Sequence, residues 1–227
     1  MNEGGLVMRE LYEKLLEYLK NEDKEKSLNL CIDALKNQRI GVIDLYQSVL
    51  APALNHIVEE YIEEEDLIWK EHVRSGIIRT IVENTYPFVI KEKGERGRGR
   101  EEKVIVMCPR FEDHELGARM ISDLFTIAGY DTTFIGANTP EKTILKAVEV
   151  IQPTYISISV TNYYNLISAK TTIDYIKNRF GDKIIFLLGG QAFVANPDSY
   201  QQIGGDFLLN SFDDIVNLTR GGGSNLN

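Results

Sequence analysis

The chain has 227 residues, of which 43% are apolar and 26% are charged, and its net charge is −9. This composition is typical of a globular protein, and the negative charge argues against broad electrostatic binding to nucleic acid or to an anionic membrane. No apolar run reaches the roughly 20 residues that a membrane helix needs, and two cysteines are too few for a disulfide scaffold, so we expect a cytoplasmic protein with reduced thiols.

The first ninety or so residues predict helices. Apolar residues recur at helical spacing in two segments, at Leu11, Leu15, Leu16, Leu19, Leu28, Cys31, Ile32 and Leu35. A third predicted helix covers about residues 42–64, and Pro52 within it indicates a kink or a break. Asp66 is the expected N-cap of a fourth helix that ends near Pro87, with Trp69 in the core. Four such segments joined by short connections predict a four-helix bundle.

A charged segment separates this bundle from the rest of the chain. Residues 91–102 read KEKGERGRGREE, which holds three glycines and no apolar residue. Such a segment is typical of a solvated linker, here between a helical domain at 1–90 and a second domain at 103–220. The last residues, 221–227 (GGGSNLN), are typical of a disordered tail.

From Lys103 the pattern changes to short apolar runs separated by helical segments. The runs lie at 104–108, 132–136, 154–160, 184–190 and 206–210. Helices are predicted at about 115–129, 141–151, 163–180 and 195–203, with a last short one from Asp213. This alternation predicts a flavodoxin-like, doubly wound α/β domain with a five-stranded parallel sheet. Ligands of such domains bind beyond the carboxyl ends of the strands, at the switch point between the first and third.

A histidine follows the first predicted strand, where such a ligand would bind. Glu112 lies two residues before His114, with Asp113 between them, and Gly117 lies three residues after it. A glycine at the expected start of a helix is poor for helix propensity. Its missing side chain, however, allows a bulky, flat ligand to approach the backbone closely.

Small residues end the third and fourth predicted strands. The third carries Ser157, Ser159 and Thr161 near its carboxyl end, and the fourth ends with Gly189 and Gly190. These residues should border the same crevice as the histidine, because the carboxyl ends of parallel strands share one edge of a sheet. The paired glycines lack the remainder of a G-x-G-x-x-G fingerprint, which argues against a dinucleotide cofactor.

Residues 103–215 resemble the cobalamin-binding domain that methionine synthase, corrinoid methyl carriers and light-sensing cobalamin regulators share. The family pattern is an acid-x-His-x-x-Gly motif, a Ser-x-Leu or Ser-x-Thr motif after the third strand, and a Gly-Gly pair after the fourth. The corresponding segments here are Glu112-x-His114-x-x-Gly117, Ser159-x-Thr161 and Gly189-Gly190. Three motifs in order, each at the end of the matching strand, make the resemblance specific.

The resemblance implies a way of holding cobalamin. The nucleotide tail of the cofactor leaves the cobalt and enters a slot lined by the Ser/Thr and Gly-Gly loops, and His114 takes the vacated lower axial position. Neutral imidazole is a good ligand for a transition metal. A carboxylate on its far ring nitrogen fixes the tautomer and raises the basicity of the ligand, and Glu112 is the candidate for this role.

Residues 45–72 resemble the helical cap that covers the upper face of the cofactor in these proteins. Light-sensing members carry a Trp, then nine residues, then Glu-His, whereas this chain has Tyr61, nine residues, and Glu71-His72. The resemblance implies that Tyr61 stacks at the upper face and that Glu71 and His72 lie near the upper axial position. His72 is therefore a candidate upper ligand of the cobalt.

Two functions fit this set of residues. The leading interpretation is a cobalamin-binding sensor that holds adenosylcobalamin between the cap and the α/β domain and responds to light or to cofactor availability. The alternative is a corrinoid protein that carries a methyl group, as methylcobalamin, between methyltransferases. Glu112 and the Glu71-His72 pair favour the sensor, whereas Tyr61 in place of the family Trp and a missing output domain favour the carrier, or a sensor that acts through a separate protein.

We assign no catalytic side chain, so the chain would take part in catalysis only as the corrinoid subunit of a methyltransferase system. The expected partners are cobalamin and either a separate protein or further copies of the chain. Direct contacts to nucleic acid or to a membrane are not expected.

Overall fold

The computed structural model describes residues 3–60, 68–97 and 99–218. The chain forms two compact units, Met1–Glu95 and Arg96–Asn227. Of the segment 91–102 that the sequence predicts as a linker, residues 91–96 continue the last helix of the first unit. Among the described residues, no helix combines the length and the apolar character that crossing a membrane requires.

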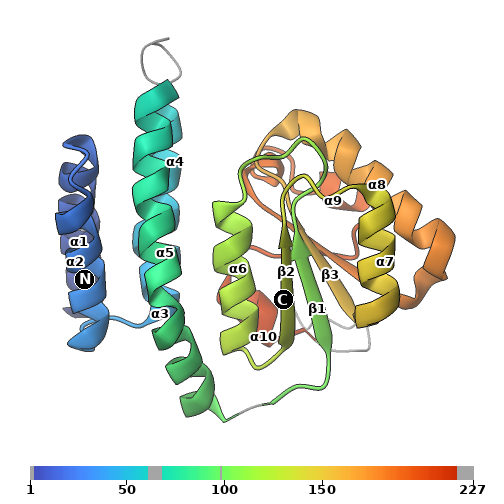
Figure 1. The fold of residues 1–227 in the computed structure, drawn as a ribbon, viewed down its shortest axis with the longest axis horizontal. Coiled ribbons are helices and arrows are strands. Elements are labelled where there is room, and N and C mark those ends of the chain that lie inside the picture. Colours follow the sequence, from blue (N-terminus) through green and yellow to red (C-terminus); the bar gives the residue numbers. More distant parts are fainter. Residues whose placement is uncertain (1–2, 61–67, 98, 219–227) are drawn as a thin grey trace. The chain divides into compact units, whose positions relative to one another are not determined.

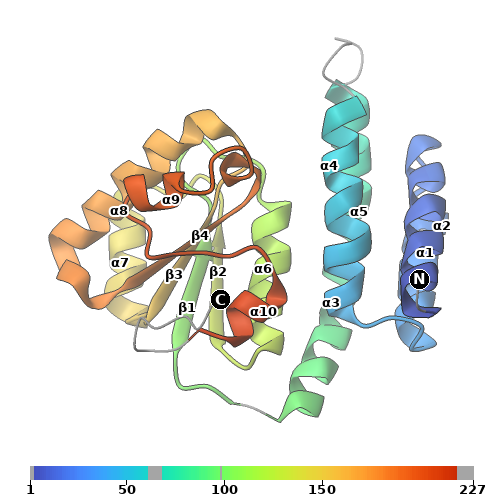
Figure 2. The same cartoon turned by 180° about the vertical axis from the view of Figure 1, so that it is seen from behind.

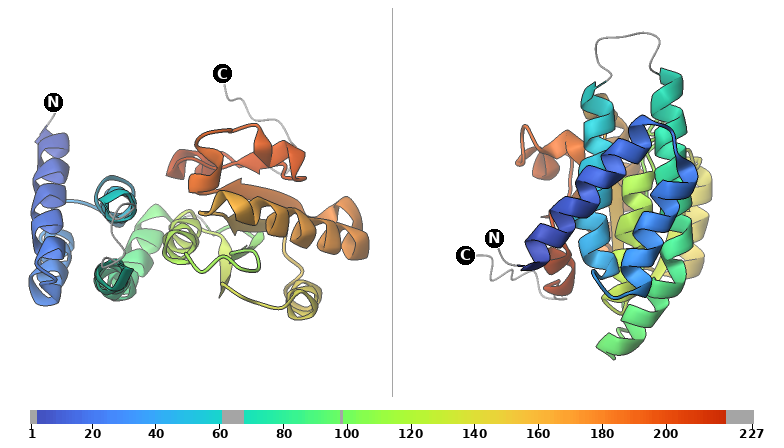
Figure 3. Two further views of the ribbon diagram at one scale, coloured as in Figure 1. Left: turned by 90° about the horizontal axis from the view of Figure 1, so that it is seen from above. Right: turned by 90° about the vertical axis from the view of Figure 1, so that its left-hand side faces the viewer.

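The first unit consists of helices α1 (Glu3–Lys20), α2 (Lys24–Lys36), α3 (Val42–Asp44), α4 (Ala51–Glu60) and α5 (Ile68–Arg96). A π-helical segment, Leu45–Leu50, joins α3 to α4, so these three pieces form one continuous third helix. The helix α1 packs against α2 and against this third helix (Figure 3). Leucines and isoleucines from all parts of the unit form its core, including Leu11, Leu15, Leu45, Leu50, Ile78 and Ile81. The prediction of an N-terminal helical bundle is confirmed.

The two prolines of the bundle both lie inside helices. The π-helical segment ends two residues before Pro52, and the Ala51 amide bonds the Tyr46 carbonyl five residues back. The helix continues through Pro52 in α4, so the predicted break is absent. Pro87 lies inside α5, so the prediction that the helix ends there is wrong. An interior proline costs a helix about 3 kcal/mol. Buried residues on both sides, such as Ile81 and Val89, pack the helix into the bundle and offset this cost.

The first turn of α5 corrects a second prediction. Trp69 is 57% exposed and so is not a core residue. The ammonium group of its neighbour Lys70 lies 5.6 Å from the ring centroid. Asp66, the predicted N-cap, lies outside the described residues.

The second unit is built on a parallel sheet of strands β1 (Lys103–Met107), β2 (Asp131–Gly136), β3 (Tyr155–Ser159), β4 (Ile185–Gly189) and β5 (Phe207–Leu208). The strand order is β2-β1-β3-β4-β5, and every neighbouring pair is parallel. This order places the switch point between β1 and β3, because the connections leave these two strands in opposite directions. The flavodoxin-like, doubly wound fold predicted from the sequence is confirmed.

Helices cover both faces of this sheet (Figures 1 and 2). They are α6 (Leu116–Ile127), α7 (Glu141–Ile151), α8 (Leu166–Phe180), α9 (Ser199–Gln202) and α10 (Phe212–Val216). The helices α6 and α10 pack together on one face, and α7 and α8 on the other. The buried core between the sheet and α7–α8 includes Ile105, Ile156, Phe186 and Ile173.

The end of the predicted linker belongs to the α/β unit. The Arg100 guanidinium donates hydrogen bonds to the Tyr130 hydroxyl and to the Val216 carbonyl, both at 2.7 Å. It also stacks over the Tyr130 ring at 4.5 Å from the centroid. Arg100 therefore fastens the start of the unit to α10 near its end.

Candidate cobalamin site

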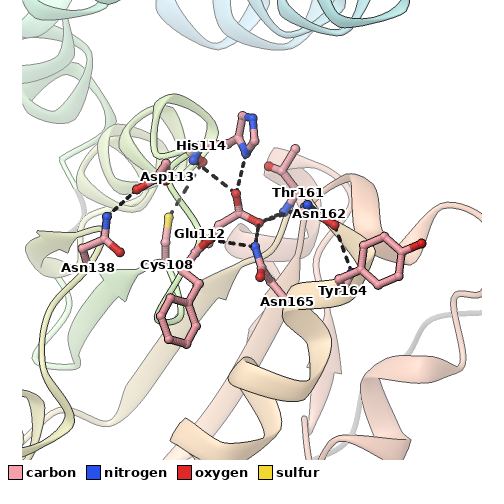
Figure 4. A network of polar contacts seen from close by, with 10 residues as sticks. Cys108, Glu112, Asp113, His114, Asn138, Thr161, Asn162, Tyr164 and Asn165 are labelled. Carbon is pink, nitrogen blue, oxygen red and sulfur yellow. Dashed lines mark hydrogen bonds and ion pairs between the residues drawn. The ribbon is translucent and has the colours of Figure 1, made fainter. Parts of the chain in front are cut away.

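A buried carboxylate lies where β1 and β3 end, and several donors converge on it (Figure 4). Glu112 follows β1 and has no exposed surface. Its Oε1 accepts a hydrogen bond from the His114 amide at 3.2 Å and lies 2.5 Å from the Nδ1 of the His114 ring. Its Oε2 accepts bonds from the amides of Thr161 and Asn162, at 3.0 and 2.8 Å, and from the Asn165 side chain at 3.0 Å. The loop after β3 therefore positions the Glu112 carboxylate, and this carboxylate in turn orients the His114 ring.

These contacts keep Glu112 ionised. Burial by itself would raise the pKa of this carboxyl, because it disfavours the charged form. The hydrogen bonds from the His114 ring, the Asn162 amide, the Asn165 side chain and the His114 amide outweigh burial and lower the pKa to about 2. A carboxylate at Nδ1 favours the tautomer that carries its proton on Nδ1, so the other ring nitrogen, Nε2, has a lone pair for a metal.

The His114 side chain is 55% exposed, whereas the acid behind it is fully buried. The Nε2 atom lies on the side of the ring opposite the carboxylate. Below the loop, the Cys108 thiol donates to the His114 carbonyl at 3.8 Å, and burial raises the pKa of this thiol to about 12. Cys108 is therefore a neutral packing group rather than a metal ligand.

The residue before Glu112 adopts an unusual conformation. Phe111 has a φ of 68°, in the left-handed region that is uncommon for residues other than glycine. The Asn165 side chain donates to the Phe111 carbonyl at 3.1 Å, and the Ser168 hydroxyl donates to the Arg110 carbonyl at 2.7 Å. Asn165 is also the N-cap of α8, yet its side chain does not cap the helix because it is turned toward this loop. The start of α8 therefore fixes the turn that leads into the site.

Asn162, Asn165 and Ser168 were missed by sequence reasoning. The available signal was the run of polar residues directly after the third strand, Thr161-Asn162 and Asn165, at the edge where ligands of this fold bind. No spacing rule links these positions to Glu112, since the contact depends on how the two loops meet.

Other predicted site residues lie around this centre. Asp113 points to the loop after β2, where its carboxylate accepts a hydrogen bond from the Asn138 side chain. Gly117 lies in the first turn of α6, and a Cβ added there would have the Ser159 hydroxyl, 4.0 Å away, as its nearest neighbour. Ser159 is partly exposed, whereas Ser157 is buried. The space above Gly117 is thus open to a ligand that would lie against the backbone.

The fold itself explains the two glycines at the end of β4, Gly189 and Gly190. Gly190 has a φ of 106°, and a Cβ added there would lie 2.9 Å from the Val160 carbonyl carbon and 3.0 Å from its amide nitrogen. A Cβ on Gly189 would lie 3.1 Å from the Leu209 carbonyl oxygen. Close backbone approach between β3, β4 and β5 therefore requires glycine here, whether or not a nucleotide tail binds beside them.

The predicted upper-face residues belong to the helical unit. Tyr61 lies outside the described residues. Glu71 and His72 are in the first turn of α5, where His72 is exposed and its Nε2 lies 3.4 Å from a carboxylate oxygen of Glu71. Their role near the upper axial position stays a prediction.

The protein-family model of the B12 binding domain matches residues 102–215, which is half of the chain. The chain belongs to the B12-binding domain family. Trimethylamine corrinoid protein 1 of Methanosarcina acetivorans is 20% identical over 215 residues, covering 93% of this chain and 96% of that protein. The structure of the Methanosarcina barkeri monomethylamine corrinoid protein superimposes with a TM-score of 0.77 at 15% identity, covering 92% and 96%. A methanol:cobalamin methyltransferase complex, also from M. barkeri, reaches a TM-score of only 0.45 at 18% identity, covering 91% and 77%.

The residues of this B12-binding domain fit the cofactor. A half-exposed imidazole with a fixed tautomer is a suitable axial ligand for cobalt. Within the described parts of the chain, no group of three or more His, Cys, Asp or Glu side chains could hold a metal ion. His114 alone would hold the cobalt of cobalamin, and the corrin ring would supply the other nitrogen ligands.

Proposed function

We propose that this protein carries a methyl group on cobalamin between methyltransferases, with His114 as the lower ligand of the cobalt. The His114 ring, half-exposed and bonded through Nδ1 to the buried, ionised Glu112, supports the ligation of cobalt. The match over nearly their whole length to corrinoid proteins for trimethylamine and monomethylamine supports the carrier role. Bound cobalamin would supply a cobalt centre that accepts a methyl group from one partner and gives it to another. The chain itself binds and orients the cofactor.

Each side chain has a part in that orientation. Glu112 holds the imidazole in one tautomer, so that Nε2 is the metal-binding atom. Gly117 leaves the backbone open on the side of Ser159. We assign the nucleotide tail to the neighbourhood of Ser157, Ser159 and the Gly-Gly turn, as the family motifs imply.

The relatives favour the carrier over the sensor. Two of them are named as corrinoid proteins for trimethylamine and monomethylamine, and each is matched over nearly its whole length. None of the relatives described above is named as a sensor. We therefore favour methylcobalamin over adenosylcobalamin as the working form, a methyltransferase as the partner, and methylated amines as the first methyl donors to test.

Histidine ligation can be tested directly. The protein is produced with ¹⁵N-labelled histidine, loaded with cobalamin and reduced to cobalt(II), and the nitrogen coupling is read by electron paramagnetic resonance. We expect coupling to one labelled nitrogen in the wild type and its loss in His114→Ala. His56→Ala, which removes an exposed histidine of α4, is the matched control and should keep the coupling. A wild-type spectrum that is insensitive to the label would refute His114 as ligand.

Carrier and sensor are separated by a second pair of measurements. A carrier should be methylated by a purified corrinoid-dependent methyltransferase acting on a methylated amine. A sensor should instead give a stable product after green illumination of the adenosylcobalamin-loaded protein, with a spectrum that changes in His72→Ala. That second result, without methylation, would contradict the carrier function.

A further inference from the structure

A cavity of about 150 Å³ lies in the helical unit, where the end of α1, the middle of α4 and the start of α5 meet. Leu16, Leu19 and Ile57 form its apolar wall, and the last two are at most 2% exposed. A cavity of this size has room for about six non-hydrogen atoms, since an engineered apolar cavity of the same volume binds benzene. The cavity therefore suits a small molecule with a short hydrocarbon part.

Two cationic side chains line the same cavity. Arg74, in the second turn of α5, is only 4% exposed, and Lys20 is the last residue of α1. The Nη2 atom of Arg74 donates to the Lys20 carbonyl at 3.3 Å and to a Glu22 carboxylate oxygen at 3.2 Å. Charge-assisted hydrogen bonds are usually shorter, about 2.7–2.9 Å. These two contacts therefore leave room for a closer and stronger contact between the guanidinium and an anion in the cavity.

The charges around the cavity favour an anion over a cation. Two cations and a single carboxylate, that of Glu17, line the cavity, in a chain whose net charge is −9. Glu17 and the remaining lining residue, His56, are exposed, whereas Arg74 is buried. Water and salt screen an exposed charge much more than a buried one. The buried guanidinium therefore dominates the field inside the cavity.

Arg74 also has a role within the fold, because it binds the carbonyl of the last residue of α1, where a helix carries partial negative charge. That role accounts for the position of its Nη2 atom. It does not account for a cavity beside the guanidinium, because protein interiors are close-packed and contain few voids larger than a water molecule.

We propose that this cavity is a binding site for a short-chain carboxylate. The carboxylate group would bind to Arg74 and Lys20, and the hydrocarbon chain would lie against the two leucines and Ile57. A guanidinium suits this ligand, because its planar fork of donors matches the two oxygens of a carboxylate. The inference does not depend on the carrier function proposed above, since all the lining residues belong to α1, α4 and α5.

The test is a titration of full-length, ¹⁵N-labelled protein followed by two-dimensional ¹H–¹⁵N nuclear magnetic resonance at constant ionic strength. Butyrate is the probe, because its size matches the cavity. Butylammonium has the same hydrocarbon chain with the opposite charge, and inorganic phosphate has the charge without the chain. We expect butyrate to bind with a dissociation constant of about 1 mM and to shift signals of α1, α4 and α5. The two control molecules should bind at least about tenfold more weakly.

Three variants locate the ligand. Lys20→Gln should raise the dissociation constant of butyrate by about threefold, because a partly exposed charge contributes modestly. Leu16→Phe fills the cavity and should abolish binding. Lys14→Gln removes an exposed lysine of the same helix that lies outside the cavity, and this variant should bind butyrate as the wild type does. If Leu16→Phe does not fold, Lys20→Gln and the control molecules still decide the question.

Four results would overturn the proposal. Butyrate at tens of millimolar that leaves the wild-type spectrum unchanged would exclude the site. Butylammonium that binds as tightly as butyrate would mean that Glu17, rather than Arg74, selects the ligand. Phosphate that binds as tightly would mean that the hydrocarbon wall plays no part. A folded Leu16→Phe variant with wild-type affinity for butyrate would place the ligand outside the cavity.

Discussion

Replacing Glu112 by glutamine should reveal how strongly the site depends on one buried charge. The fold lowers the pKa of this carboxyl from an ordinary value of 4.5 to about 2. Each pKa unit corresponds to 1.36 kcal/mol, so the ionised form gains up to about 3 kcal/mol in the folded state. Because the pKa is lowered on folding, this stability is present above about pH 5 and is lost as the pH falls toward 2. Glu112→Gln should therefore be less stable at pH 7 by about this amount, and the difference should shrink in acid.

The structure gives a second reason for the loss in Glu112→Gln. The amide of glutamine would turn an NH₂ group either toward the His114 ring or toward the donors of Thr161, Asn162 and Asn165, so one contact becomes donor against donor.

Urea unfolding followed by circular dichroism between pH 7 and pH 3 measures the difference between variant and wild type. Glu149→Gln is the control, because this exposed glutamate on α7 pairs with Lys146 at the surface, and its midpoint should hardly move. If the free energies of unfolding of Glu112→Gln and the wild type differ by the same amount at every pH, or do not differ, the charge of Glu112 is not what stabilises the site.

Two glycine substitutions should give opposite results. Gly190→Ala is expected to lower the free energy of unfolding by about 3 kcal/mol or more, because its Cβ meets the Val160 backbone and its φ is positive. Urea unfolding without cofactor measures this change. A variant as stable as the wild type would show that the strand ends can separate without cost. Gly117→Leu should unfold at nearly the wild-type midpoint, since only the Ser159 hydroxyl is near its Cβ, but should bind cobalamin at least tenfold more weakly by titration. Normal binding by this variant would place the cofactor elsewhere.

The sequence predicts this fold well wherever hydrophobic periodicity is strong. The helix predicted at 141–151 is α7 with the same bounds, and all five strands were found, although β5 is limited to Phe207–Leu208. The failures have physical causes. Proline normally ends a helix, but tertiary packing keeps α5 helical through Pro87. Trp69 follows the helical period but faces outward at the start of α5.

The candidate site was also predictable only in part. The pairing of Glu112 with His114 was implied by the resemblance to the cobalamin-binding family, and the structure places these side chains in contact. Asn165 could not be expected, because its link to Glu112 depends on the meeting of two loops far apart in the chain. Gly190 was recognised from its motif, but a sequence does not show that the Val160 backbone lies where its side chain would be.

Two of the three hydrogen bonds that Glu112 accepts at Oε2 come from the main chain, and this affects how the protein could be altered. The amides of Thr161 and Asn162 remain donors whatever side chains these positions carry, with proline as the exception. A mutant library at these two positions could therefore change the shape and polarity of the crevice while the imidazole keeps its orientation. Grafting only the histidine and its acid onto another flavodoxin-like scaffold would, for the same reason, leave the acid unsupported. The transferable unit is the pair of loops after β1 and β3 together.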